Sequence, residues 1–253
     1  MDRGGTSSTE TWDSLFSEFY LRAYASDERD AGAGEQALAA ARLSGCPPDG
    51  ELLDVPCGFG RHSIPLAAAG YRVVGVDRSQ ALLDEAQRRG GDGVRFVHAD
   101  YRELPFADAS FDAALNLYTS IGFLGDEEDT RALAEIGRVL RPGARLVIEA
   151  MHRDRLMTLS SDRHWELLGE GRLLVAQSTF DHASGVAQTT QTLIDAGNRR
   201  ESRTWSIRVY TATELIAMLD RAGFAEAKCY GDLHGGPLGS ETRLVIVART
   251  ADA

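Results

Sequence analysis

The chain has 253 residues, of which 43% are hydrophobic and 26% are charged, and its formal net charge is −11. This composition is that of a globular protein with a full core, and the length suits one α/β domain with an appended subdomain. The acidic balance argues against a duplex nucleic-acid partner, because such binding depends on clustered Lys and Arg that neutralise phosphates.

Three cysteines, Cys46, Cys57 and Cys229, are an odd number without metal-ligand spacing. They favour free thiols in a reducing compartment. The first thirty residues lack the apolar core of a secretory signal, and no apolar run approaches the length of a membrane span. We therefore expect a cytoplasmic protein with no membrane partner and no bound metal.

The N-terminal fifty residues change character twice. Residues 1–10 are polar and rich in Gly, Ser and Thr, which predicts a disordered tail. An aromatic stripe at helical spacing then predicts a helix; its members are Trp12, Leu15, Phe16, Phe19, Tyr20 and Tyr24. A Gly-containing break follows, and a second helix is expected around residues 35–43.

From Glu51 apolar strands alternate with amphipathic helices, and this alternation predicts a doubly wound, mostly parallel sheet over residues 51–162. The expected strands are 51–55, 72–76, 94–98, 112–117 and 144–149. The expected helices are 61–69, 79–89 and 127–140, the last of them stopped by Pro142-Gly143.

After Met151 this rhythm is lost. Residues 165–209 contain turns at 182–185 and 195–198 between runs of Thr, Val, Ile and Leu. In the last run Trp205, Ile207 and Val209 alternate with polar residues, which is the period of a half-buried strand. We predict an antiparallel insertion of three or four strands over 163–210. Residues 211–253 then complete the core with a helix at 211–222 and strands near 225–231 and 242–249.

The stretch ELLDVPCGFGRHSIPLAAAGYRVVGVDRS, residues 51–79, predicts a nucleoside site. In an open parallel sheet ligands bind outside the carboxyl ends of the strands where the strand order reverses, and the first strand-helix turn lies there. Gly58 and Gly60 make that turn tight and allow close backbone approach. Asp77 ends the second strand, where a carboxylate can accept both hydroxyl protons of a ribose.

Two cofactor classes fit this layout. A dinucleotide site usually has a third glycine, at the position of Ser63, and an acid at Asp54 would repel a pyrophosphate. The same acid would attract the cationic head group of an amino acid. Asp100 and Tyr101 follow the third strand, where they could receive an adenine amino group and cover its ring. These features favour S-adenosylmethionine.

The segments LDVPCGFGRHS, VVGVDRS, FVHADYRELPF, FDAALNLYTSIGFL and IGRVLRPGARLVIE resemble the class I S-adenosylmethionine-dependent methyltransferase family. The resemblance is strongest over residues 51–150 and extends to small bacterial enzymes with an antiparallel insertion. It implies a seven-stranded Rossmann-like fold, a helical lid over residues 11–50, and cofactor contacts at Pro56, Arg78, Asn116 and Leu117. Pro56 departs from the glycine that the family usually has there.

The acceptor end of the site is less well determined. An aromatic face at Tyr118 could attract a positively charged sulfur. His152 follows the fifth strand and is our candidate base for a hydroxyl acceptor, whereas an amine needs only orientation and a dry site. The lid would bring Tyr20 and Tyr24 to the acceptor, and further candidate contacts are Arg208, Tyr210 and His234.

These observations predict methyl transfer to a nitrogen or oxygen of a small molecule. One alternative is a protein that binds S-adenosylmethionine without transferring methyl, as a sensor or a repurposed enzyme. A nicotinamide-dependent oxidoreductase is a second alternative, which Ser63 and Asp54 disfavour. The insertion could roof the acceptor pocket or form a homodimer surface, since exposed strand edges need covering.

Overall fold

The structure, a computed structural model, describes residues 14–26, 30–158 and 163–252. The tail expected at residues 1–10 and Trp12 of the aromatic stripe lie outside these ranges. Within the described part of the chain, no helix combines the length and the apolar character that a membrane span requires.

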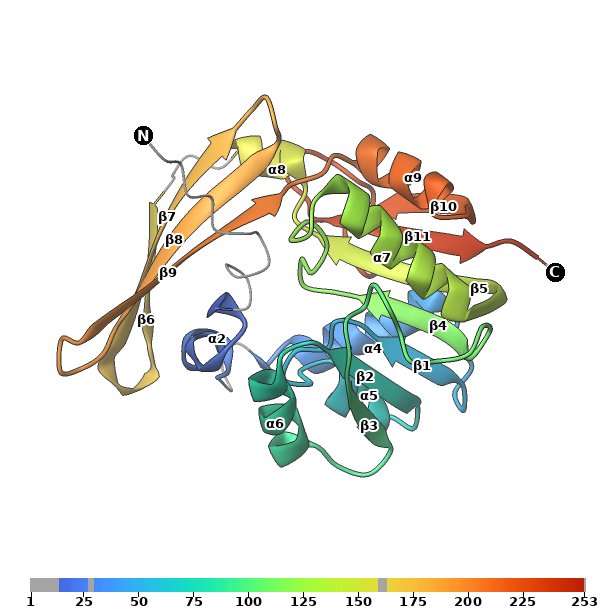
Figure 1. The fold of residues 1–253 in the computed structure, drawn as a ribbon, viewed down its shortest axis with the longest axis horizontal. Coiled ribbons are helices and arrows are strands. Elements are labelled where there is room, and N and C mark those ends of the chain that lie inside the picture. Colours follow the sequence, from blue (N-terminus) through green and yellow to red (C-terminus); the bar gives the residue numbers. More distant parts are fainter. Residues whose placement is uncertain (1–13, 27–29, 159–162, 253) are drawn as a thin grey trace.

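A seven-stranded sheet forms the centre of the molecule, in the order β10-β11-β5-β4-β1-β2-β3 (Figure 1). Its strands are β1 (Glu51–Asp54), β2 (Arg72–Asp77), β3 (Val94–His98), β4 (Phe111–Asn116), β5 (Leu140–Ala150), β10 (Phe224–Tyr230) and β11 (Leu244–Thr250). Only β11 runs antiparallel to its neighbours β5 and β10. The strand order reverses between β1 and β4, and the predicted doubly wound, mostly parallel sheet is confirmed.

Period-two alternation along the strands builds two hydrophobic cores on opposite faces of this sheet. Leu52 of β1 packs with α4 (Ala33–Ser44) and α5 (Ser63–Ala68). Its neighbour Leu53 packs with α7 (Asp126–Val139) and α9 (Ala212–Arg221). Helix α6 (Gln80–Arg89) lies against β2 and β3. Because both faces are covered, the strands appear in the sequence as continuous apolar runs.

The helix boundaries follow local chemistry. Thr211 caps α9 in a reciprocal capping box with Glu214, and Ser79 caps α6 by accepting from Leu82 N–H. Helix α7 ends at Val139, and Pro142-Gly143 belongs to an irregular start of β5 in which the pairing with β4 skips from Leu140 to Arg145. Strand β5 therefore begins four residues earlier than we expected.

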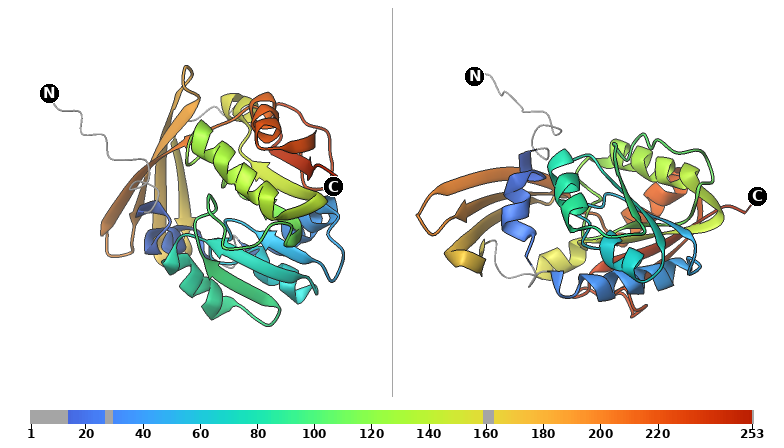
Figure 2. Two further views of the ribbon diagram at one scale, coloured as in Figure 1. Left: turned by 45° about the vertical axis from the view of Figure 1, so that its right-hand side comes forward. Right: turned by 90° about the horizontal axis from the view of Figure 1, so that it is seen from below.

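The insertion is a four-stranded antiparallel sheet. It consists of β6 (Arg163–Leu168), β7 (Arg172–Asp181), β8 (Val186–Ile194) and β9 (Arg200–Arg208). Two short elements that we did not anticipate are α8 (Arg153–Thr158) and a 3₁₀ turn, η1 (Gly169–Gly171). Figure 2 shows that this sheet stands beside the layered core.

Helix α2 (Glu18–Tyr24) lies between the insertion and the α6 side of the core (Figures 1 and 2). Its apolar face, with Phe19 and Ala23, packs on the insertion residues Leu174 and Leu193. Its connection to the core includes the Ser79 hydroxyl, which donates to the backbone oxygen of Phe16 at 2.5 Å. Of the predicted lid over residues 11–50, α4 instead packs in the core, and a lid function of α2 stays a prediction.

Candidate active site

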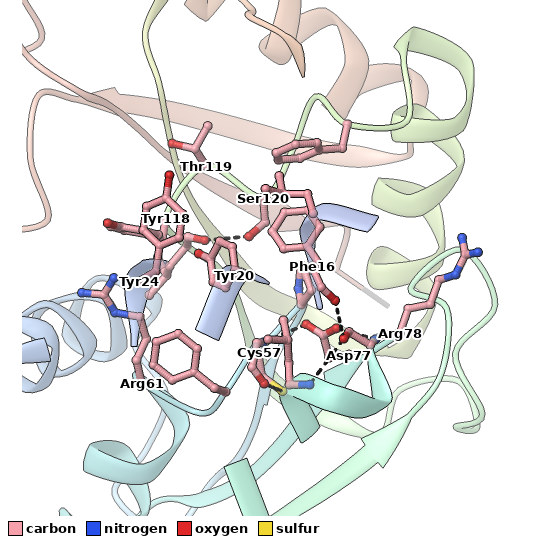
Figure 3. Close-up of a pocket in the computed structure, with 18 of the residues that line it drawn as sticks. Phe16, Tyr20, Tyr24, Cys57, Arg61, Asp77, Arg78, Tyr118, Thr119 and Ser120 are labelled. Atoms are coloured by element: carbon pink, nitrogen blue, oxygen red, sulfur yellow. Dashed lines mark hydrogen bonds between the residues drawn. The ribbon is translucent and has the colours of Figure 1, made fainter. Parts of the chain in front are cut away.

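A cavity of about 630 Å³ lies at the carboxyl ends of the parallel strands, where the strand order reverses. The glycine turn after β1, the ends of β2 and β4, helix α2 and strand β9 all contribute to its wall. Figure 3 shows Asp77 and Arg78 toward one side of the cavity and Tyr24, Arg61 and Tyr118 toward the other. This is the position that the switch-point rule predicts for a ligand.

The glycine turn leaves space for a ligand. Gly58 has φ +57°, and a Cβ placed on it would meet no atom within 4 Å. Gly60 has φ +81°, and a Cβ there would lie 3.0 Å from both Ile64 and Phe96. Gly58 therefore leaves open space beside the turn, whereas the lack of a side chain at Gly60 lets the turn pack closely against Ile64 and Phe96.

Asp77 faces the cavity from the end of β2. Gly58 N–H donates to its Oδ2 and Ser79 N–H donates to its Oδ1, both at 2.8 Å. Burial raises the pKa of Asp77, and these N–H bonds oppose the rise. Because each carboxylate oxygen has a second lone pair, the fixed carboxylate can still accept two hydroxyl protons.

Asp54 lies behind the turn and does not line the cavity. Its side chain is buried, and the Ser63 hydroxyl donates to Oδ2 at 2.5 Å. The other oxygen, Oδ1, has no hydrogen-bond partner among the residues that the structure describes. Burial raises the pKa of Asp54 to about 7. Ser63, at the position of the third glycine of a dinucleotide turn, therefore has a structural role here: its hydroxyl forms a hydrogen bond with the Asp54 carboxyl.

The remaining predicted cofactor residues divide into two groups. Pro56, Arg78, Tyr101 and Leu117 line the cavity. Asp100 does not, and its carboxylate is held by the Arg102 guanidinium at 2.6 and 3.0 Å.

Asn116 is also outside the cavity wall. It is fully buried, and its Nδ2 donates to Val55 O at 2.8 Å. This bond ties the end of β4 to the start of the glycine turn. The structure therefore gives Asn116 a role in holding the turn.

Aromatic side chains build the other end of the cavity. Tyr20 stacks on Tyr24 with ring centroids 4.6 Å apart, and Phe16 meets both Tyr20 and Phe123 at 5.1 Å. Phe123 in turn lies 5.7 Å from Trp205 of β9. This chain of rings joins the lid, the loop after β4 and the insertion into one wall. Tyr20 and Tyr24, predicted to meet the acceptor, are both part of it.

Four predicted acceptor contacts lie outside the cavity wall. His152 is buried, with Nε2 3.5 Å from Asp154, and its Nδ1 has no hydrogen-bond partner within the described part of the chain. Tyr210 is also buried, and its hydroxyl donates to Asp129 at 2.8 Å.

Arg208 is paired with Glu214 at 2.5 Å, and His234 lies in an exposed loop. The alternation along β9 explains the placement of Arg208: the apolar side of the strand, with Trp205 and Ile207, faces the cavity instead. The predicted ligand contacts of this group thus lack support from their positions.

Sequence reasoning missed several residues of the wall. The most prominent are Arg61, Phe123, Trp205, Ile207 and Arg243. Arg61 directly follows the glycine turn, so its position was a usable signal; its guanidinium lies 4.1 Å from the centroid of the Tyr118 ring. The others come from segments far apart in the sequence, and only the packing of the insertion and lid brings them together.

The wall offers little base strength. His62 lines the cavity, but burial and the neighbouring Arg61 lower its pKa to about 3. Burial also raises the pKa of the Cys57 thiol well above its usual value. Among the described residues, no cluster of three His, Cys, Asp or Glu side chains could hold a metal ion. The cavity is thus a mainly apolar, aromatic enclosure in which the imidazole of His62 is a weak base.

Comparison with known proteins agrees with this geometry. The profile of a family described as "Methyltransferase domain" matches residues 52–143. Demethylmenaquinone methyltransferase of Clavibacter sepedonicus is 46% identical over 105 residues, which are 40% of this chain and 42% of that protein. This chain thus matches about two fifths of the length of such relatives.

Two other proteins are similar over nearly the whole chain. Cypemycin N-terminal methyltransferase of Streptomyces sp is 30% identical over 248 residues, covering 92% of this chain and 96% of that protein. The structure of SAM-bound CalS10, an amino pentose methyltransferase from Micromonospora echinaspora, superposes with a TM-score of 0.71. It is 29% identical, with 92% of this chain and 97% of that chain covered. These matches therefore extend well beyond residues 52–143.

Proposed function

The chain belongs to the class I S-adenosylmethionine-dependent methyltransferase family, and we propose that it transfers a methyl group from S-adenosylmethionine to a nitrogen or oxygen of a small molecule. The observation that carries this proposal is the pairing of Asp77 with the open turn at Gly58. A carboxylate fixed at the cavity wall beside a glycine whose Cα side is open suits a ribose and the chain attached to it.

Each part of the cavity has a task in this reaction. Asp77 would accept the ribose hydroxyls, while Leu117 and Tyr101 enclose the nucleoside. When bound, S-adenosylmethionine supplies a methyl group on a positively charged sulfur. The lid residues Tyr20 and Tyr24 would exclude water and orient the acceptor for in-line attack.

An amine nitrogen is the acceptor atom that the site supports best. A hydroxyl acceptor calls for a base with a pKa near neutrality, whereas the pKa of His62 is lowered to about 3. A neutral amine can attack without prior loss of a proton to the protein. Cypemycin N-terminal methyltransferase, which is similar over nearly the whole chain, supports the same choice by its name.

The test is transfer of label from methyl-labelled S-adenosylmethionine into a small-molecule extract. We expect a labelled small product from the wild-type protein and none from Asp77→Ala. Asp84→Ala is the matched control, because Asp84 is an exposed carboxylate on α6 that accepts a hydrogen bond from Gln80, one helical turn away. It should retain full transfer.

Two results would contradict the proposal. Binding of the cofactor without label in any small molecule or protein would favour a sensor or a repurposed enzyme. Binding of a nicotinamide dinucleotide in its place would favour the oxidoreductase. A cytoplasmic location, a homodimer and the absence of a nucleic-acid partner stay predictions from the sequence.

A further inference from the structure

Two consecutive residues in the loop that follows β4 have a left-handed backbone. Tyr118 and Thr119 both have φ of 61°. Residues other than glycine rarely adopt this conformation, and a residue branched at Cβ such as threonine is a marked outlier there. Strained residues of this kind persist where surrounding contacts hold them, and they cluster at ligand sites.

Glu149 and Arg243 supply the contacts that hold this bend. Tyr118 N–H donates to Glu149 Oε2 at 2.8 Å, and Thr119 N–H donates to the backbone oxygen of Glu149 at 2.9 Å. Arg243 donates to Thr119 Oγ1 at 2.6 Å and also pairs with the Glu149 carboxylate. Glu149 lies near the end of β5, opposite Val245 of β11. Because β5 is paired with β4 on one side and β11 on the other, the position of Glu149 is fixed by the sheet.

The bend directs the Tyr118 ring into the cavity. This side chain is 38% exposed although its neighbour Leu117 is buried, and it lines the cavity wall (Figure 3). Arg61 lies over the ring at 4.1 Å from its centroid. The faces of an aromatic ring are negative and attract cations. The contact with the Arg61 guanidinium is an interaction of this kind.

Figure 3 shows Tyr118 on the opposite side of the cavity from Asp77. In S-adenosylmethionine the sulfur is bonded to the carbon next to the ribose, so a donor whose ribose is held by Asp77 would bring its sulfur into the cavity that Tyr118 also lines. We propose that Glu149 and Arg243 are positioning residues that hold the Tyr118 ring toward this positively charged sulfur. The inference rests on the proposed function, because it requires the donor to bind in this cavity.

The product S-adenosylhomocysteine has a neutral sulfur, so comparing the two ligands isolates the contact with the charge. Isothermal titration would measure both dissociation constants for the wild type and for Tyr118→Leu, Thr119→Ala, Thr119→Ser and Glu149→Gln. We expect Tyr118→Leu to reduce the preference for S-adenosylmethionine by about 2- to 30-fold, the range of a cation–π contact. Thr119→Ala and Glu149→Gln should reduce it in the same direction, whereas Thr119→Ser keeps the hydroxyl and the preference.

Adding Glu149→Gln to Tyr118→Leu should cause no further loss of preference, since the positioned ring is already gone. The inference is overturned if Tyr118→Leu leaves the preference unchanged. It is also overturned if Glu149→Gln and Thr119→Ala weaken both ligands equally while lowering the melting temperature, because that pattern indicates structural support alone. A wild-type protein that binds neither ligand would instead contradict the proposed function, on which the inference depends.

Discussion

Replacing Asp54 by asparagine should remove a large part of the pH dependence of stability in the cofactor-free protein. The pKa of this buried carboxyl is about 7, against 3.8 for the ordinary group. Below pH 3.8 the carboxyl is protonated in both the folded and the unfolded chain, and the folded state keeps its full stability. Between about 3.8 and 7 only the unfolded chain releases the proton, so rising pH favours unfolding.

The size of this effect follows from the shift. A difference of about 3 pKa units at 1.36 kcal/mol each corresponds to a loss of about 4 kcal/mol in the free energy of unfolding by pH 7. Asp54→Asn retains an oxygen for the Ser63 hydroxyl but has no charge to bury. An unsatisfied amide group of the asparagine would lower the free energy of unfolding by an amount that does not change with pH.

Urea denaturation from pH 4 to pH 8 would measure the difference. We expect the free energy of unfolding of the wild type to fall more steeply than that of Asp54→Asn up to about pH 7, and the two to run parallel above it. Ser63→Ala is the matched variant: the Ser63 bond lowers the pKa of Asp54, so its loss should extend the steep region to higher pH. Parallel curves for wild type and Asp54→Asn between pH 4 and 7 would refute the reasoning.

Three further predictions concern the turn, the polar core and the lid. Gly60→Ala should destabilise the protein by about 2–4 kcal/mol, because φ +81° is combined with a Cβ 3.0 Å from Ile64 and Phe96. The added Cβ of Gly58→Ala meets no atom within 4 Å, so this variant should lose only about 1–2 kcal/mol of stability but bind the cofactor more weakly. Equal melting temperatures of the two variants would contradict this contrast. Tyr210→Phe should cost about 1–3 kcal/mol in chemical denaturation, since buried Asp129 loses a hydrogen bond, and an unchanged midpoint would disprove it. Phe16→Ala removes the ring between Tyr20 and Phe123. Limited proteolysis within residues 14–26 should therefore become faster, while the melting temperature of the core stays nearly constant. An unaltered cleavage rate would show that the ring does not hold α2 in place.

The fold could be predicted because its signals are local. Leu52 and Leu53 belong to opposite cores, so β1 had to read as a continuous apolar run, and helices at regular intervals identified a parallel sheet. The placement of Gly58 and Asp77 together at the cavity was equally accessible, because they lie beyond β1 and at the end of β2, which are neighbouring parallel strands. Their contact with a nucleoside stays a prediction.

The acceptor side depends on contacts that no local pattern reveals. Alternation along β9 separated Trp205 and Ile207 from Arg208, but it could not tell which side faces a ligand. Arg208 on the polar side pairs with Glu214, while Trp205 and Ile207 on the apolar side line the cavity. Arg243 reaches Thr119 across 124 positions in sequence, a contact that only the order of strands creates.

Direct titration of the cofactor tests the central claim, that the cavity beside Gly58 and Asp77 holds S-adenosylmethionine. Isothermal titration of the wild type with S-adenosylmethionine should give one site per chain, and Asp77→Ala should weaken it about 10-fold or more, as expected for the loss of hydrogen bonds to a charged group. Equal binding to wild type and Asp77→Ala would contradict the account, because the ribose would then be held elsewhere.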